Sequence, residues 1–428
     1  MADNYRKSSG SPVAWNFACN TMDGAMYSFG MSFLSLLIVL PVFVKKLGGN
    51  EIAIGLIPVL WALGFNLPQL LIAPVVRNLV RKKPLVLKTA FLQRLPWLLL
   101  AIMTLFLGSG ISPTMGLVGF FSLFFLAALT GGINLPGWFD LVSKLTLVNV
   151  RGRLFALRST IGALLGILGG WLVHLILEQL MFPWNFALIF FIGYGVLLVS
   201  FFFITLLKEE DSNDLPPIVP GWRRMVAARK IFSNDRNFVY FLVADSLMVI
   251  ALMGNAFITV FALEKFARPA SEIGLYTMVM MASMIAGSLA FGFLGDHFGH
   301  RLNLTAAGVL TTISAVVAVL AANINIFLIV FVLSAMTIGI IQVSRLTIVA
   351  EFSPSGERAS YVAVAHLVAL PFAFSGIIAG WIAAAWSYEV LFIVVGIFAF
   401  LSALVWIFAV REPRLLPART IPAKPFET

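Results

Sequence analysis

Residues 183–207 read PWNFALIFFIGYGVLLVSFFFITLL, a run of 25 residues without a charged side chain. A helix needs roughly 20 apolar residues to cross a bilayer, so this run is long enough to be a transmembrane helix. Eleven further runs share its length and apolar character. They cover approximately residues 13–44, 52–76, 85–107, 115–141, 154–176, 238–263, 273–294, 302–322, 326–349, 361–385 and 390–410. The sequence therefore predicts an all-α membrane protein with 12 transmembrane helices.

The composition excludes a soluble globular protein. Of the 428 residues, 60% are hydrophobic and 11% are charged. Water would not tolerate such a surface, whereas lipid does, because a helix satisfies its own backbone hydrogen bonds. Cys19 is the lone cysteine, so no intramolecular disulfide is expected, and no Cys or His spacing indicates a metal site. We expect no cofactor, and a proton is the candidate coupling ion.

Lysine and arginine are concentrated in alternate connections between the runs. Of 29 such residues, 23 fall on one side of the predicted membrane, and the other side holds only Lys45, Lys46, Lys265 and Arg268. We place Arg158 among the 23, in the connection before the fifth helix. By the positive-inside rule, both termini are expected in the cytoplasm. The net charge of +10 follows this pattern, so we do not expect a nucleic-acid partner.

The other connections are short, and the first apolar run is too long for a cleavable signal peptide. We therefore expect a multi-pass protein of the inner (plasma) membrane of a bacterium, surrounded by membrane lipid and present as a monomer.

A polar stretch divides the runs into two sets of six. Residues 208–236 combine acidic residues, prolines and a basic segment at 222–232, none of which can enter lipid. A helix lying on the membrane surface is one possibility for the basic segment. The expected domains are a six-helix bundle at 1–207, a cytoplasmic linker at 208–236, a second six-helix bundle at 237–411 and a cytoplasmic tail at 412–428.

Short repeats indicate that the two sets of six arose by duplication. Residues 166–171 (GILGGW) in the fifth run recur as 376–381 (GIIAGW) in the eleventh, and Asn16-Phe17 recurs as Asn237-Phe238. Repeats in this order are typical of duplicated transporter halves. The alternative is that pairs of small residues recur wherever membrane helices pack closely.

The connection between the eighth and ninth runs carries the most specific motif. Residues 292–301 read GFLGDHFGHR, the pattern G-x-x-x-D-x-x-G-x-R. We expect Gly292 to let one helix approach its neighbour, Gly299 to permit a tight turn, and Asp296 to bond with Arg301 at a helix end. This motif, together with twelve helices in two halves and a long middle link, resembles the major facilitator superfamily along the whole chain. The resemblance implies two pseudo-symmetric six-helix bundles.

The matching connection in the first half departs from the motif. Arg77 stands where the motif has its Asp. In the family this connection braces the cytoplasmic gate through ion pairs, and the resemblance implies the same role here with exchanged polarity. Asp140 is then expected to pair with Arg77 or Arg81, and Arg345 with Asp296.

Ionisable residues inside spans are costly and need a reason. They include Asp23 in the first span, Arg94 in the third and Asp245 in the seventh. The resemblance implies that an acid in the first helix can carry a coupling proton, which makes Asp23 the main candidate and Asp245 its counterpart. The alternative is that Asp23 and Arg94 form a static brace.

Polar and aromatic residues fall at positions that the resemblance assigns to a central cavity. They are Asn20, Tyr27, Asn66, Gln69, Asn134, Trp138, Asn255, Gln342 and His366. Each amide could instead join two helices. As a set they favour a small neutral or amphipathic organic solute, because a phosphate or dicarboxylate would require convergent Arg or Lys.

These observations predict a secondary active transporter that works by alternating access. No Gly-x-x-x-x-Gly-Lys-Ser/Thr loop is present, so ATP is not the direct energy source, and no nucleophile and base pair indicates an enzyme. One alternative is a multidrug or lipid exporter, for which Gly162, Gly166 and Gly170 match a pattern whose proline position holds Ile167. Another is a membrane receptor or assembly factor of the same fold that transports nothing.

Overall fold

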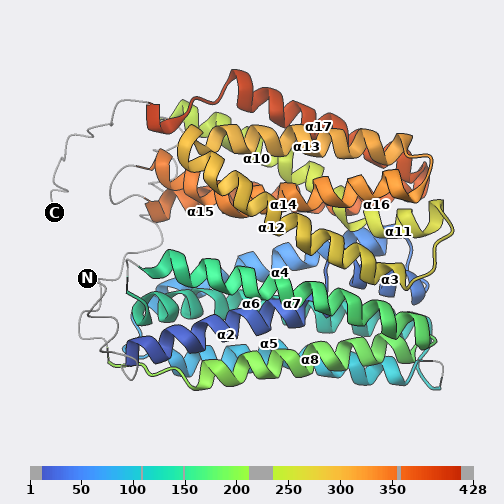
Figure 1. Ribbon diagram of the computed structural model, residues 1–428, viewed down its shortest axis with the longest axis horizontal. Helices are drawn as coiled ribbons and strands as arrows, with labels where there is room; N and C mark the ends of the chain where they lie inside the picture. The colour runs from blue at the N-terminus through green and yellow to red at the C-terminus, as the bar shows by residue number, and fades with distance from the viewer. Residues whose placement is uncertain (1–11, 108, 148–149, 212–234, 354–357, 416–428) are drawn as a thin grey trace.

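The computed structural model describes residues 12–107, 109–147, 150–211, 235–353 and 358–415. Within these ranges the chain forms α-helices and short 3-10 helices, with no β-strand. The helices run roughly parallel to one long axis and form two bundles, which fill the lower and upper halves of Figure 1. α2 begins and the last long helix, α17, ends on the same side, at the left of the figure. We call this side the basic end, because Lys83 and Arg301 lie there.

The first bundle contains the helices of the first half of the chain. They are α2 (Pro12–Phe33), α3 (Val39–Lys46), α4 (Glu51–Arg77), α5 (Lys83–Leu105), α6 (Pro113–Leu145), α7 (Arg151–Gln179) and α8 (Trp184–Thr205). α2 packs against α7 and α8, α6 packs against α4 and α5, and α5 also packs against α8.

The second bundle contains the helices that follow residue 235. They are α10 (Arg236–Leu252), η2 (Met253–Ala256), α11 (Ile258–Lys265), α12 (Glu272–Phe298), α13 (His300–Leu320), α14 (Ile324–Phe352), α15 (Arg358–Ala369), η3 (Leu370–Phe374), α16 (Ser375–Ala385), α17 (Tyr388–Phe408) and η4 (Pro413–Leu415). α14 packs against α12 and α13, and α17 packs against α10 and α13. The predicted linker segment 222–232 and most of the tail lie outside the described residues.

The described helices account for the twelve predicted crossings. Eleven segments are long and apolar enough to span a membrane. α2 is not among them, because it carries buried polar residues such as Asn16, Asn20 and Asp23. Three crossings that we expected to be single helices are interrupted, namely α2 with α3, α10 with α11, and α15 with α16.

Side-chain caps fix where several helices begin. The side chains of Asn50, Ser112, Asp235, Asn323 and Ser387 each accept a hydrogen bond from the backbone N–H three residues later. Such a cap satisfies one of the backbone donors that a helix start leaves without an internal partner.

The repeat seen in the sequence has a structural counterpart at the basic end. The Asn16 side chain donates to the carbonyl of Lys208 and accepts from its N–H, at 2.9 and 2.8 Å. Asn237 makes the same two bonds with Arg411, also at 2.9 and 2.8 Å. Each asparagine therefore ties the first helix of its bundle to the chain leaving the last one.

A second device also recurs in both bundles. Lys83 donates to the carbonyls of Thr205 and Leu207 at the end of α8, at 2.8 and 2.6 Å. Arg301 donates in the same way to Trp406 and Ile407 at the end of α17, at 2.9 and 2.6 Å. A cation at a helix C-terminus satisfies free carbonyls and opposes the helix dipole. Arg301 thus binds helix ends, whereas we expected it to bond with Asp296, which is exposed.

The glycines of the motif at 292–301 differ in their roles. Gly299 has a φ of +90° and makes the turn between α12 and α13, as predicted. Gly292 was expected to face a neighbouring helix, but a methyl group added there would meet nothing within 4 Å. The close approach is instead at Gly295, where a methyl group would lie 2.6 Å from the Asn303 side chain.

The two bundles meet mainly where α7 crosses α12 and where α4 crosses α16. Both crossings are made by glycines near the end opposite the basic one. A methyl group at Gly55 would overlap the carbonyl oxygen of Gly376, and one at Gly274 would overlap that of Gly170. At the basic end, by contrast, a methyl group added at Gly152 on α7 would meet nothing within 4 Å. The repeated glycine motifs thus hold the bundles together at one end.

Candidate functional site

Asp23 on α2 is the centre of a polar cluster inside the first bundle. Its residue exposure is 2%. Its Oδ1 accepts a hydrogen bond of 2.8 Å from Ser200 Oγ, which in turn accepts one of 2.8 Å from Arg94 Nη2. Arg94 also donates to the carbonyls of Leu197 and Ala90, at 2.7 and 2.8 Å. The brace between Asp23 and Arg94, which was the alternative to proton coupling, therefore runs through hydrogen bonds of Ser200.

The second carboxylate oxygen of Asp23 makes longer contacts. Arg158 Nη2 and Trp138 Nε1 both lie 3.4 Å from Oδ2. The Arg158 guanidinium also covers the Trp138 ring at 4.7 Å and donates to the carbonyl of Asn20 at 2.7 Å. A methyl group at Gly24 would overlap this guanidinium, so the Arg158 side chain would have to move. We had placed Arg158 in a connection, but it lies inside α7 with a side-chain exposure of 11%.

Asn20 lies beside Arg158 and Asp23 and is fully buried. Neither its amide nitrogen nor its amide oxygen has a hydrogen-bond partner among the described residues. Buried side-chain amides are nearly always bonded to protein or to water, and each exception calls for an explanation.

The second bundle contains a more complete ion pair. Arg345 on α14 donates from Nε and Nη2 to the two carboxylate oxygens of Asp245 on α10, both at 2.7 Å. His366 on α15 lies close enough to interact electrostatically with both residues. The pair that we expected between Arg345 and Asp296 is therefore not the one that forms.

The two ion pairs lie at similar depths. Asp23 follows Pro12 by 11 positions, and Asp245 follows Arg236 by 9. At 1.5 Å per helical residue, both acids are roughly 15 Å from the basic end. Their arginine partners come from helices that start or end at the same side.

The other predicted cavity residues have more local roles. The Tyr27 hydroxyl accepts a bond of 3.0 Å from Gln93, and Asn134 accepts one of 2.8 Å from Thr89. Asn66 and Gln69 donate to carbonyls of their own helix, at 2.8 and 2.7 Å. These side chains therefore stabilise helices or join neighbouring ones.

Two further cavity candidates lie in the second bundle. Asn255 is buried in η2. Gln342 is exposed on α14, and its amide nitrogen lies 3.9 Å from the sulfur of Met284 on α12.

Among the gate residues of the first half, Arg81 has a different partner from the expected one. Arg81 pairs with Asp211, and this hydrogen bond holds the pKa of the Asp211 carboxyl below its usual range. Asp140 is half-buried on α6. The side chain of Arg77 lies outside the described part of the chain, so its expected pair with Asp140 remains a prediction.

At the end opposite the basic one, an ionic contact joins the two bundles. Lys45 Nζ lies 2.6 Å from Glu51 in the first bundle and 3.1 Å from Glu264 in the second. Tyr388 of the second bundle donates to Glu51 at 3.2 Å. Burial acts to lower the pKa of Lys45, but its hydrogen bonds to the two glutamates outweigh burial and raise it. We call Lys45, Glu51, Glu264 and Tyr388 the closing cluster.

Sequence reasoning did not find Arg158, Ser200 or the closing cluster. Arg158 lies four positions inside the predicted span at 154–176, and this position was a usable signal. Ser200 and Tyr388 give no such signal, because only packing decides which polar side chains meet.

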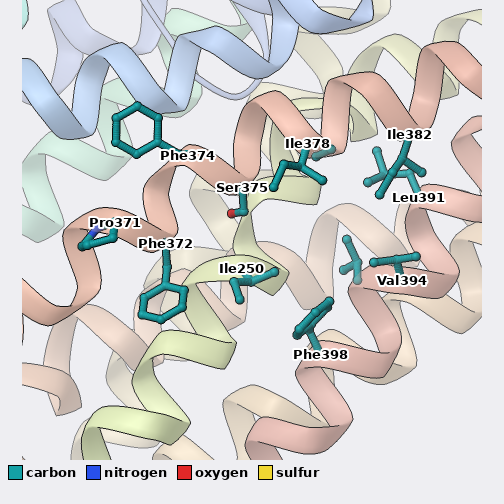
Figure 2. A pocket seen from close by; sticks show the side chains of 12 residues that line it. Ile250, Pro371, Phe372, Phe374, Ser375, Ile378, Ile382, Leu391, Val394 and Phe398 are labelled. Atoms are coloured by element: carbon teal, nitrogen blue, oxygen red, sulfur yellow. The ribbon is translucent and has the colours of Figure 1, made fainter.

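A separate apolar pocket of about 220 Å³ lies between α10, η3 with α16, and α17. Figure 2 shows its lining, which includes Ile250, Phe372, Ile378 and Phe398. Ser375 is its one polar lining residue, and no ionisable side chain contributes to it. The pocket is therefore distinct from both ion pairs.

Comparison with known proteins gives a family match for part of the chain and a shared fold for nearly all of it. Residues 246–427 match the Major Facilitator Superfamily. Among curated proteins, none matches this sequence.

Solved transporters share the fold across nearly the full chain. A D-xylose-proton symporter is 16% identical with a TM-score of 0.68, covering 94% of this chain and 99% of the symporter. A POT family transporter in complex with 5-aminolevulinic acid is 12% identical with a TM-score of 0.70, covering 95% and 96%. The nucleoside transporter NupG is 12% identical with a TM-score of 0.62, covering 93% and 98%.

Proposed function

We propose that this chain, a member of the major facilitator superfamily by the match of its second half and the fold of its whole length, is a secondary transporter of a small organic solute. One observation carries the proposal. The bundles are joined at one end by glycine crossings and the closing cluster, while two buried ion pairs lie toward the other end.

The described state then corresponds to one half of an alternating-access cycle. The positive-inside rule puts the basic end in the cytoplasm, so the joined end faces outward and the two ion pairs lie toward the inner side. Separating the closing cluster and bringing the basic ends together would make the ion pairs accessible from the other side. Rigid rotation of one bundle against the other is the motion that such repeats support.

Proton coupling is part of the proposal. Asp23 and Asp245 are both paired with arginine here. Protonation of either acid would weaken its ion pair with arginine. Release of the proton to the cytoplasm would restore the ion pair. Asp23 is the main candidate, because its contacts with Arg158 and Trp138 are long.

The experiment is solute uptake into liposomes that contain the purified protein, with and without a pH gradient. We expect the gradient to drive accumulation, and we expect Asp23→Asn to abolish accumulation while exchange without a gradient persists. Glu389→Gln, which removes an acid at the start of α17, is the matched control and should retain accumulation.

Two outcomes would contradict the proposal. Accumulation that survives both Asp23→Asn and collapse of the gradient would reject coupling at this site. A protein that binds solutes but never moves any of them would act as a receptor, one of the alternatives that the sequence left open.

A further inference from the structure

We propose that the transported solute is an organic anion whose carboxylate binds Arg158 and Asn20, an inference that rests on the proposed function and names its substrate class. The charge of the cluster around Asp23 is the first argument. Asp23 acts electrostatically on Tyr27 of its own helix, on Arg94 of α5 and on Arg158 of α7. The α6 and α8 helices contribute the uncharged Trp138 and Ser200.

Within the described part of the chain, these groups leave one positive charge without a counter-ion. Two guanidinium groups face one carboxylate, and Asp23 is the acid that acts on Arg158 within the described residues. A buried charge without a partner is costly, and an ionisable group inside a membrane protein marks a functional site by default. A monovalent anion would neutralise the cluster.

The hydrogen bonds show which arginine is available. Arg94 makes three bonds of 2.7 to 2.8 Å and is 2% exposed, so it is fixed. A guanidinium has five N–H donors, yet Arg158 makes two bonds with the described residues, one of them 3.4 Å long. Its side chain is 11% exposed, so part of it remains accessible. Arg158 can therefore donate hydrogen bonds to an additional oxyanion.

Asn20 supplies the second, independent observation. Its buried amide lies beside Arg158, and its N–H donors have no acceptor among the described residues. A carboxylate has two oxygens, so it can accept from the guanidinium and from this amide together. The Asp245 pair offers no such site, because Arg345 already holds both oxygens of its partner.

This assignment narrows the neutral or amphipathic solute that the sequence favoured. The sequence argued against a phosphate or dicarboxylate, which would require convergent Arg or Lys, whereas a monocarboxylate requires one such residue, here Arg158. The Trp138 and Tyr27 rings lie in the cluster, each with an arginine over one face, and such rings suit an apolar body, so an amphipathic organic acid fits both features.

The test compares benzoate and butyrate with their neutral amides, benzamide and butyramide, as stabilisers of the purified full chain and as uptake substrates. We expect the acids to bind and the amides to bind far less. Arg158→Gln should weaken acid binding about 10- to 100-fold, the value of a charged hydrogen bond. Arg153→Gln, on the same helix but exposed, is the matched control and should bind as the parent does.

Arg158→Lys is a second variant for the case that Arg158→Gln fails to fold. It keeps the positive charge and loses the paired N–H donors of the guanidinium. It should still prefer acids over amides, with lower affinity. Amides that bind as well as acids, or acid binding unchanged in Arg158→Gln, would overturn the inference. Uptake of neutral solutes alone would reject the anion and leave transport standing. Acid binding that depends on Arg158 but is not accompanied by any uptake would support the anion site and reject transport.

Discussion

At the scale of single residues, the two buried ion pairs differ in how completely they are formed. Arg345 holds both oxygens of Asp245 at 2.7 Å, whereas Arg158 reaches one oxygen of Asp23 at 3.4 Å. In the tighter pair, the arginine already uses its Nε and Nη2 donors on the carboxylate, so it has little capacity to bind a solute. We therefore assign Asp245 and Arg345 the larger share in stability, and Asp23 and Arg158 the larger share in solute and proton exchange.

This difference makes a stability prediction for the tighter pair. Asp245→Asn leaves the Arg345 charge buried without a partner, so it should destabilise the protein by about 3 kcal/mol. The double variant Asp245→Asn with Arg345→Gln should recover most of that loss, because no charge remains unpaired. Thermal unfolding in detergent measures both. A double variant as unstable as the single one would show that charge pairing is not the cause.

The sequence indicated part of the site at this scale. Asp23, Asp245 and Arg94 were found because a charge inside an apolar run stands out. Arg158 was missed because it lies near the start of its run, where a basic residue is usually attributed to the connection. The unpartnered amide of Asn20 could not be foreseen, because hydrogen bonding depends on the neighbouring helices.

At the scale of helices, the glycine crossings decide how closely the bundles approach. The Gly55 and Gly376 pair joins α4 to α16, and the Gly170 and Gly274 pair joins α7 to α12. Repetition of the GxxxGW motif predicted a duplicated unit, and the structure gives that motif a place at the crossings.

A methyl group at either crossing should therefore prevent the joined end from closing. Gly55→Ala and Gly274→Ala are expected to shift the protein toward an outward-open state and to slow transport. Spin labels on Ser109→Cys and Ala322→Cys, both exposed at that end, report the separation of the bundles in a Cys19→Ser background. We expect longer distances in both variants.

Gly195→Ala is the control for these substitutions, because a methyl group there meets nothing within 4 Å. It should leave the label distance and the transport rate as they are in the parent. An unchanged distance in Gly55→Ala or Gly274→Ala would show that the backbone adjusts to the methyl group.

The interruptions within helices mark the limit of what hydropathy predicts. The crossing at 13–44 breaks between Phe33 and Val39, in a stretch without proline or glycine. Only tertiary packing distinguishes such a break from a continuous helix. Pro371 in η3 was a possible signal for the break in the eleventh crossing, since proline lacks the N–H that a helix needs.

At the scale of the whole molecule, the closing cluster contributes the ionic part of the joined state. The raised pKa of Lys45 means that its contribution is fully present below its ordinary value of 10.5. That contribution is lost only as the pH rises through the raised pKa. The cation therefore stays charged across the neutral range.

Lys45→Met should move the labels at Ser109 and Ala322 apart, because Glu51 and Glu264 then repel each other without a cation between them. The difference between this variant and the parent should be the same at pH 6 and at pH 9. A difference that vanishes at pH 9 would mean that Lys45 titrates near neutrality. Lys46→Met, one residue later, is the matched control.

The arrangement of two halves was predictable at this scale, because twelve apolar runs and the charge asymmetry survive any error in helix boundaries. The state of the cycle was not. Whether the bundles meet at one end or the other depends on a few contacts among side chains that are far apart in the sequence, such as Lys45 with Glu264.

The two asparagine pairs at the basic end have a consequence for how the molecule is put together. Asn16 and Asn237 each fasten the first helix of a bundle to the chain that leaves its last helix, so each half ties its own two ends together without the covalent connection between the halves. Two separately synthesised fragments should thus be able to fold alone and reassemble side by side. The covalent connection between the halves would then serve to supply the two halves in equal number.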